Sequence, residues 1–354
     1  GQTSGVAFAL PIPTAGKFRN LSGRLINAPG GGATRSLTLE HNGSPSALAG
    51  TFGAADTTVL DGDEVTVAAG DYVNLVASIT GTPAASRLYV SLEFEPDDPE
   101  EAVLFGAWFV DSTADRAFCL GAGYQSDLIG LANERDAQVE APLSGTITAW
   151  YLRTSAPTIS GTYDFSLRSA MSSIVGPLQL TGTTNTIQAT GLSIAFGAGD
   201  MLSVIDDETS STGPGAPVCS ALLYKPTVAG ESMVVAATAD TPQTAATEYN
   251  AFASGNRSWS TSQGAFVVMS GPTAWVLRKF LVRLETAPGT GDTRTFTVMG
   301  DGSPLTNSVS LVGAATTGQD TTHENTIPGG TLLENRSTIA NSPGVTNAIC
   351  WSLV

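Results

Sequence analysis

The side chains that most often carry out chemistry in proteins are scarce in this chain of 354 residues. It has two histidines, His41 and His323, and neither lies at the spacing of a zinc-binding motif. No Gly-x-Ser-x-Gly sequence marks an activated serine, and a Ser/His/Asp triad assembled from distant residues is the one catalytic arrangement left open. We therefore predict that the protein is not an enzyme and that it binds no zinc.

The three cysteines, Cys119, Cys219 and Cys350, predict small, buried and unpaired thiols. Cys219 and Cys350 occupy corresponding places in two of the repeats described below, shortly before Leu222 and Leu353. Corresponding positions of separate domains lie much farther apart than the ~7 Å that a disulfide can bridge between Cα atoms. The cysteines therefore do not indicate a disulfide-stabilised scaffold.

Two acidic clusters, Asp61–Gly62–Asp63–Glu64 and Asp206–Asp207–Glu208, are the best candidates for a metal site, and a third acidic run covers Glu95–Glu101. Calcium takes about six to eight oxygen ligands and accepts loop carboxylates. None of the three has the spacing of a known calcium loop, so solvated loop charge is the alternative interpretation. The sequence predicts no bound cofactor and leaves only calcium open.

Aromatic side chains could bind a sugar ring if they were exposed. Three of the five tryptophans, Trp150, Trp275 and Trp351, lie in strand-like segments, which favours the core or a subunit contact. Trp259 lies in the polar segment Asn256–Ser262 next to Arg257. We expect Trp259 to be exposed, and Trp259 and Arg257 are the candidate contact with a glycan or a protein partner.

The overall charge of the chain excludes one class of partner. The formal net charge is −16, and the isoelectric point is near 4.3. A surface this acidic repels the phosphates of nucleic acids. No stretch is long and apolar enough to span a membrane. We therefore expect neither nucleic acid nor a membrane among the partners.

The elements that must position these residues occur three times along the chain. Ala-Pro markers end at Pro29, Pro157 and Pro288, which are 157 − 29 = 128 and 288 − 157 = 131 residues apart. A second marker contains Gly70, Gly199 and Gly329, which are 199 − 70 = 129 and 329 − 199 = 130 residues apart. Two markers with one period indicate three copies of a domain-sized unit.

Within each copy, short Thr/Val/Leu-rich runs between Gly, Pro, Asn and Asp predict β-strands with many turns. Alternation over Val73–Ile79 and Phe280–Leu284 indicates strands with one buried face. Asn42–Gly43 and Asp301–Gly302 predict tight hairpins, and Val175–Gly176–Pro177 takes that place in the second copy. We predict an all-β protein of three tandem jelly-roll-like antiparallel β-sandwich domains, over residues 1–101, 102–227 and 228–354.

The first copy differs from the others at its start. Phe118 and Phe252 lie in segments ahead of the second and third cores, and they are 252 − 118 = 134 residues apart. No counterpart precedes the first core, whose first expected strand is Val6–Ile12. The sequence therefore predicts that unit one lacks a leading strand. A strand from a neighbouring chain, or a segment ahead of Gly1, would cover the exposed edge.

Several of these motifs resemble a β-sandwich repeat of virion structural proteins from tailed bacteriophages, such as capsid decoration and fibre proteins. The matching segments are Ala15–Leu21, Ala28–Gly30 and Ala68–Asp71 in unit one, and Thr295–Val298, Asp301–Gly302 and Asp320–His323 in unit three. Unit two departs most, because it lacks Gly after Pro157 and an Asn-Gly hairpin. The resemblance covers nearly the whole chain, and it implies a structural protein without catalytic residues.

We therefore expect a non-enzymatic structural protein located in a virion, as a capsid, decoration or fibre component. It would assemble with itself and with other particle proteins through the faces and edges of its sandwiches. Two other interpretations are a receptor- or glycan-binding fibre module, with a host surface glycan as partner, and a secreted bacterial surface-filament subunit. Both would place the protein outside a cell.

Overall fold

A computed structural model describes residues 9–110, 116–118, 120, 124–125, 129–130, 134–154, 159–182, 184–208, 216–238, 246–253, 259–264, 267–341, 343 and 349–354. Nearly all regular structure in these residues is β-strand, and the helix α1 (Glu134–Ala137) is a single turn. The predicted all-β sandwich fold is thereby confirmed. None of the helical structure in these ranges has the length and apolar character needed to cross a membrane.

The strands fall into three consecutive sets, which we call units one, two and three. Unit one contains β1 (Leu10–Pro11), β2 (Gly16–Leu25), β3 (Thr34–His41), β4 (Ser44–Phe52), β5 (Thr58–Val67), β6 (Tyr72–Thr80) and β7 (Leu88–Pro96). Unit two contains β8 (Ala102–Val110), β9 (Arg116–Phe118), β10 (Tyr124–Gln125), β11 (Ile129–Gly130), β12 (Val139–Glu140), β13 (Gly145–Thr154), β14 (Ile159–Ser169), β15 (Ser172–Gly182), β16 (Thr186–Phe196), β17 (Met201–Glu208) and β18 (Ala216–Pro226). Unit three contains β19 (Val234–Thr238), β20 (Glu248–Ala251), β21 (Val268–Met269), β22 (Trp275–Leu277), β23 (Phe280–Leu284), β24 (Gly289–Gly300), β25 (Ser303–Gly313), β26 (Thr317–Asp320), β27 (Asn325–Ile327), β28 (Leu332–Ala340) and β29 (Ile349–Leu353).

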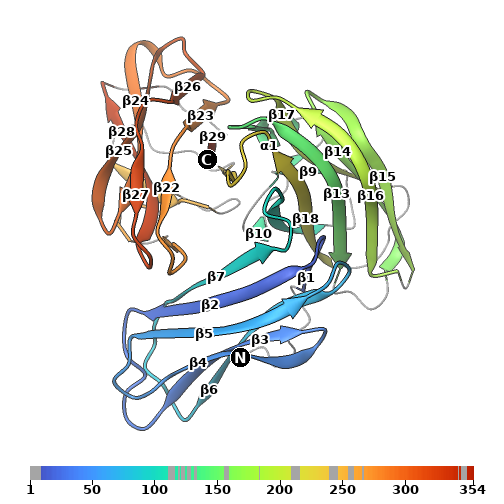
Figure 1. Ribbon diagram of the computed structural model, residues 1–354. Coiled ribbons are helices and arrows are strands. Elements are labelled where there is room, and N and C mark those ends of the chain that lie inside the picture. Colours follow the sequence, from blue (N-terminus) through green and yellow to red (C-terminus); the bar gives the residue numbers. More distant parts are fainter. Residues whose placement is uncertain are drawn as a thin grey trace.

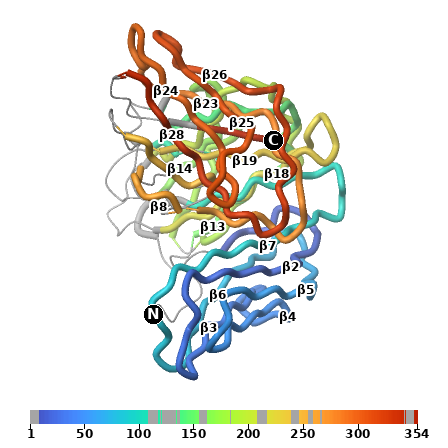
Figure 2. Tube along the Cα trace, turned by 90° about the vertical axis from the view of Figure 1, so that its left-hand side faces the viewer, coloured from blue at the N-terminus to red at the C-terminus, as the bar shows by residue number. Residues whose placement is uncertain are grey.

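Among the described strands, no sheet combines strands of two units. The three sets lie within the predicted ranges 1–101, 102–227 and 228–354, and their standing as independent domains stays a prediction. Figure 1 shows the units around a common centre, with unit one at the bottom, unit two on the right and unit three on the left. In the view of Figure 2, units two and three overlap above unit one.

Units two and three are each built as one long hairpin that is rolled up. In unit two, β8 pairs with β18, β9 and β12 with β17, β13 with β16, and β14 with β15, all antiparallel. In unit three, the same nested pairs are β19 with β29, β20 and β21 with β28, β23 with β26, and β24 with β25. The pairs alternate between two sheets, which is typical of a jelly roll.

Unit one repeats the inner pairs of this pattern, with β1 on β6, β2 on β5, and β3 on β4. Its last strand, β7, pairs with β2, and in the described residues no counterpart of β8 or β19 lies beside it. The Phe118 segment, β9, pairs with β17, so it belongs to the unit that follows it. The same holds for β20, just before Phe252, which pairs with β28. Of the expected strand Val6–Ile12, residues 6–8 lie outside the described residues, and β1 lies within the rest.

Each unit has a hydrophobic core between its two sheets. Phe18 and Phe52 are buried in unit one, Trp150 in unit two, and Phe280 and Trp351 in unit three. The indole N–H of Trp150 donates to Ser220 Oγ at 3.0 Å, and that of Trp351 donates to the carbonyl oxygen of Phe252 at 2.8 Å. Because a buried N–H is costly without an acceptor, these bonds fix two large core side chains. The core positions predicted for Trp150 and Trp351 are confirmed.

The second sequence marker forms the same turn in all three units. The N–H groups of Gly70, Gly199 and Gly330 donate to the carbonyl oxygens of Ile12, Ala141 and Gly271, at 2.8, 2.9 and 3.0 Å. All three glycines have positive φ, at 92°, 93° and 76°. The equivalent glycine of unit three is therefore Gly330 and not the expected Gly329. The corrected spacing is 330 − 199 = 131, which equals that of the Ala-Pro markers.

The hairpins of units one and three have the predicted turns. Asn42 and Gly43 have φ values of 51° and 78°, and Asp301 and Gly302 have 46° and 79°, as a type I′ turn requires. The expectation for unit two is wrong, because Val175–Gly176–Pro177 lies inside β15 and the turn is at Ala170–Met171. Both turn residues have positive φ, at 46° and 66°, a conformation that neither residue type signals.

We expect Gly70→Ala and Gly199→Ala each to lower the free energy of unfolding by about 1–2 kcal/mol, because a Cβ is strained at positive φ. No other atom lies closer than 4.0 Å to the position of either Cβ, so the backbone conformation is the cause. Urea denaturation measures the effect. The control is Gly62→Ala, in β5, where φ is ordinary and the space is open; equal midpoints for all three variants would contradict this account.

Candidate functional site: the contacts between the three units

The structure places Trp259 in the core of unit three. Its side chain is 8% exposed, and its ring centroid lies 6.1 Å from that of Phe296 and 6.2 Å from that of Trp351. The expected exposure of Trp259 is therefore wrong, because its polar sequence neighbours conceal a core residue. Arg257 lies outside the described residues. A buried indole offers no face on which a sugar ring could stack.

The acidic cluster at Asp61 holds the backbone of unit one together. The Asp61 carboxylate accepts the N–H of Ala49 at 2.7 Å and that of Asp63 at 3.0 Å, so it connects β4 with β5. Glu64 forms an ion pair with Lys17 at 3.0 Å. In the other cluster, Asp206 is fully buried in β17. The described residues contain no group of three His, Cys, Asp or Glu side chains that could hold a metal ion.

The acidic run Glu95–Glu101 links units one and two covalently, and its side chains also contact both units. Lys225 of β18 lies 2.7 Å from Asp98 and 3.5 Å from Glu100. The hydroxyl of Thr14 donates to Glu101 at 2.6 Å. The hydrogen bond from Lys225 lowers the pKa of Asp98. Exposed ion pairs contribute little stability, so these contacts orient the linker rather than hold it.

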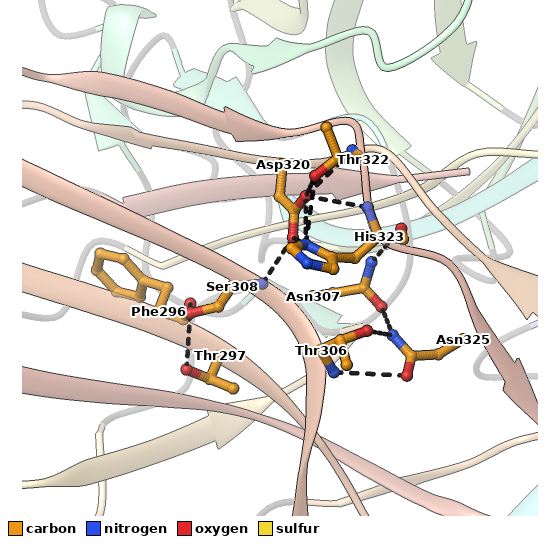
Figure 3. A network of polar contacts seen from close by, with 9 residues as sticks. All are labelled: Phe296, Thr297, Thr306, Asn307, Ser308, Asp320, Thr322, His323 and Asn325. Carbon is orange, nitrogen blue, oxygen red and sulfur yellow. Dashed lines mark hydrogen bonds and ion pairs between the residues drawn. The ribbon is translucent and has the colours of Figure 1, made fainter.

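Asp320 organises a polar network in unit three, which Figure 3 shows at close range. Its carboxylate accepts the N–H of Ser308 at 3.0 Å, and those of Thr322 and His323 at 3.2 Å each. His323 Nδ1 lies 2.9 Å from the same carboxylate. Burial alone would raise the pKa of Asp320, but these hydrogen bonds outweigh it and hold the pKa below 3.8.

Asp320 and Asp61 are equivalent. Each accepts an N–H from the corresponding strand of its unit, β25 or β4, and the N–H of the residue two positions after itself. The other histidine has a similar role, since His41 Nε2 lies 2.7 Å from Asp71. Burial would raise the pKa of Asp71, but hydrogen bonds from the Ala68 N–H, Asn42 and His41 lower it. Both histidines thus contact carboxylates that accept backbone N–H groups at turns.

We expect Asp320→Asn to lower the free energy of unfolding by about 1–3 kcal/mol near neutral pH, because it weakens acceptance of buried N–H groups. The pKa of Asp320 is depressed in the folded protein. The carboxylate therefore stabilises the fold fully at pH values above its ordinary pKa of 3.8, and this stabilisation is lost as the pH falls through its pKa in the folded protein. The difference from wild type should therefore shrink below about pH 4. Denaturation at a series of pH values measures it, with Asp63→Asn, an exposed side chain, as control. A difference that is independent of pH would contradict the assignment.

Cys219 is buried and unpaired, as predicted, and burial raises the pKa of its thiol to about 12. A thiol that stays protonated at neutral pH is a poor nucleophile. Cys119 lies outside the described residues, as does the side chain of Cys350.

The three units dock on one another in the same way. β1 of unit one packs on β18 and β13 of unit two, and β12 of unit two packs on β29, β19 and β23 of unit three. β21 of unit three packs on β7 of unit one. Because β1, β12 and β21 occupy the same place in their units, the three contacts close a ring with approximate threefold symmetry.

An equivalent arginine reaches across each of these contacts. The Arg153 guanidinium lies 3.7 Å from the ring centroid of Tyr72, in unit one. Arg283 donates to the carbonyl oxygen of Gln138, in unit two, at 3.5 Å. Arg24 lies 3.9 Å from Asp301, in unit three.

Backbone hydrogen bonds establish that these arginines are equivalent. The residues that follow them, Leu25, Thr154 and Leu284, donate to the carbonyl oxygens of the residues immediately before β5, β16 and β26, at 2.8, 2.9 and 2.7 Å. Counting four residues back from the prolines of the Ala-Pro markers matches Arg153 with Leu25 and Leu284. That match is displaced by one residue, because unit two has one residue fewer before its Ala-Pro marker.

Two of the contacts are apolar and the third is polar. Phe105 of β8 packs against the core of unit one, with its ring centroid 6.1 Å from that of Phe94. Val235 and Ala237 of β19 belong to the core of unit two. Between units three and one, Thr273 N–H donates to Glu93 at 2.9 Å. Burial would raise the pKa of Glu93, but hydrogen bonds from Thr273 and Asn20 lower it.

No protein-family model and no curated protein matches the sequence. The arrangement of the units is therefore the basis for any statement about function.

We expect the Arg153–Tyr72 contact to contribute about 1 kcal/mol of coupling energy. A double-mutant cycle with Arg153→Met and Tyr72→Leu, followed by urea denaturation, measures it. Tyr72→Phe is the control, because it keeps the ring and should keep most of the coupling. Strictly additive effects of the two substitutions would show that the guanidinium does not hold unit one against unit two.

Proposed function

We propose that the protein is a non-enzymatic structural component of a virion, in which one chain supplies three sandwiches that would otherwise come from three subunits. The observation that carries the proposal is the closed ring of equivalent contacts, with Arg24, Arg153 and Arg283 in corresponding roles. A ring of this kind presents three similar outer surfaces at fixed angles. Repetitive lateral packing in a particle requires such surfaces.

The outer surfaces of the sandwiches support the same proposal. Hydroxyl pairs cross the sheets on their outer faces, with Ser36 and Thr51 at 2.9 Å in unit one, and Thr295 and Ser310 at 2.8 Å in unit three. Such faces form wet interfaces of modest hydrophobicity. The edge strand β25 also exposes Val312, by 56%. The alternative of a glycan-binding module loses its candidate contact, since Trp259 is buried.

We expect the purified chain to form a three-lobed particle in negative-stain images and to self-associate as its concentration rises. Val312→Arg should weaken the association without changing the melting temperature, because it charges an exposed edge. Light scattering over a concentration series measures this, with Gly62→Ala as the matched surface control. A chain that stays monomeric at every concentration and is absent from particles of its source would refute the proposed function.

A further inference from the structure

Among the described strands, the last strand of unit one has one neighbour, whereas the last strands of units two and three each have two. β18 lies between β13 and β8, and β29 lies between β23 and β19. β7 pairs with β2 on one side, and no described strand pairs with its other side. The Asp97 N–H donates to the carbonyl oxygen of Ala15, and the Ile26 N–H donates to that of Arg87. These bonds show that the odd-numbered residues from 87 to 97 direct their backbone N–H and C=O groups toward β2. Because backbone groups alternate in an antiparallel strand, residues 88, 90, 92 and 94 direct theirs away from β2.

The core of unit one is incompletely covered along this edge. Leu88, Val90, Leu92 and Phe94 of β7 face the core but are only partly buried. Their equivalents in unit two, Val218, Ser220, Leu222 and Tyr224, are at most 3% exposed. On the facing sheet, Leu75 and Ile79 of β6 are 36% and 59% exposed, whereas Val204, the equivalent of Leu75, is fully buried. Both sheets of unit one are thus open on the side that β8 and β9 cover in unit two.

A cleft of about 770 Å³ lies at this edge, between β7 and unit three. Leu92, Glu93 and Phe94 line one side, and Val234, Trp275 and Val354 line the other. The location is the one that the repeat requires. β8 pairs with β18 and also packs against unit one. In the same way, β19 pairs with β29 and also packs against unit two. In the closed ring, the strand equivalent to β8 and β19 would pair with β7 and also pack against unit three.

We propose that this cleft receives a β-strand from another protein of the particle, which pairs antiparallel with β7 as β8 pairs with β18. The identity of the partner as a particle protein rests on the proposed function, but the pairing itself does not. Strand addition at an open edge gains affinity from main-chain hydrogen bonds and specificity from alternate side chains.

The two strands that occupy the equivalent position define the chemistry of the incoming strand. Ala236 faces the core of unit three, whereas Val235 and Ala237 on either side of it face unit two. By this equivalence, the incoming strand has apolar residues on both faces. In this chain, β8 and β19 have that composition, and each already pairs within its own unit. Among the described strands, a second copy therefore has neither of these two free to donate.

The repeat also predicts the register of the pairing. β19 places Val235 opposite Ser352 and Ala237 opposite Cys350. Ser352 and Cys350 are equivalent to Ser91 and Tyr89, because they pair with the corresponding residues of β23 and β2. A strand with the sequence of β19 should therefore place its residue 235 opposite Ser91 and its residue 237 opposite Tyr89.

Disulfide trapping with a synthetic peptide tests both the site and the register. The probe carries residues 232–238 with either Val235→Cys or Ala237→Cys, and the full-length protein carries either Ser91→Cys or Tyr89→Cys. We expect the peptide with cysteine at 235 to crosslink to Ser91→Cys and the peptide with cysteine at 237 to crosslink to Tyr89→Cys. The exchanged combinations should react about tenfold less, because disulfide geometry requires directly opposed Cα atoms.

Wild-type protein with its native cysteines measures background labelling, and unchanged melting temperatures show that both variants fold. Equal crosslinking in all four combinations, or none at the highest soluble peptide concentration, would overturn the proposal. Disulfide-linked dimers of Ser91→Cys without peptide would identify a second copy as the occupant and would also overturn it. Register-specific labelling of a chain that never self-associates would support the strand acceptor and refute the structural role.

Discussion

Units two and three each have a last strand with a partner on both sides, and this matters because unpaired backbone groups at a sheet edge are costly and reactive toward other chains. In units two and three the connecting chain itself is that partner. β19 leaves unit two, pairs with β29, and inserts Val235 and Ala237 into the core of unit two while Ala236 enters that of unit three. This one strand pairs with the edge of a sheet, connects two units and contributes side chains to both of their cores. Unfolding of one unit would therefore destabilise its neighbour.

The ring consequently has two strong contacts and one weaker one. Units one and two, and units two and three, share connecting strands with apolar side chains such as Phe105 and Val235. Units three and one are held by polar bonds, such as those of Glu93 and Arg24. Polar interfaces between domains resemble transient ones, so this is the contact at which the ring would open. The open edge of β7 lies at the same place, and a strand added there would complete the third contact.

The sequence was informative wherever local chemistry determines conformation. Asn42–Gly43 and Asp301–Gly302 specify their turns because these residue types accept positive φ. The Ala170–Met171 turn has no such signal, since the surrounding strands impose its conformation. Trp259 looked exposed because its neighbours are polar, yet contact with Phe296 and Trp351 buries it. The arginine contacts depend on a one-residue difference between repeats and on the docking of the units, and neither can be read from spacing alone.

The acidic side chains have a structural use. Asp61, Asp71, Asp200 and Asp320 each accept backbone N–H groups at turns or strand ends, so the carboxylates replace missing backbone partners. The remaining negative charge, within a net charge of −16, keeps the outer edges from pairing with other acidic chains. At the open edge of β7, the apolar side chains of Leu92 and Phe94 lie beside the charged side chains of Glu93, Glu231 and Arg278. The acidic outer surface and this mixed edge together restrict which chain can be added to the ring.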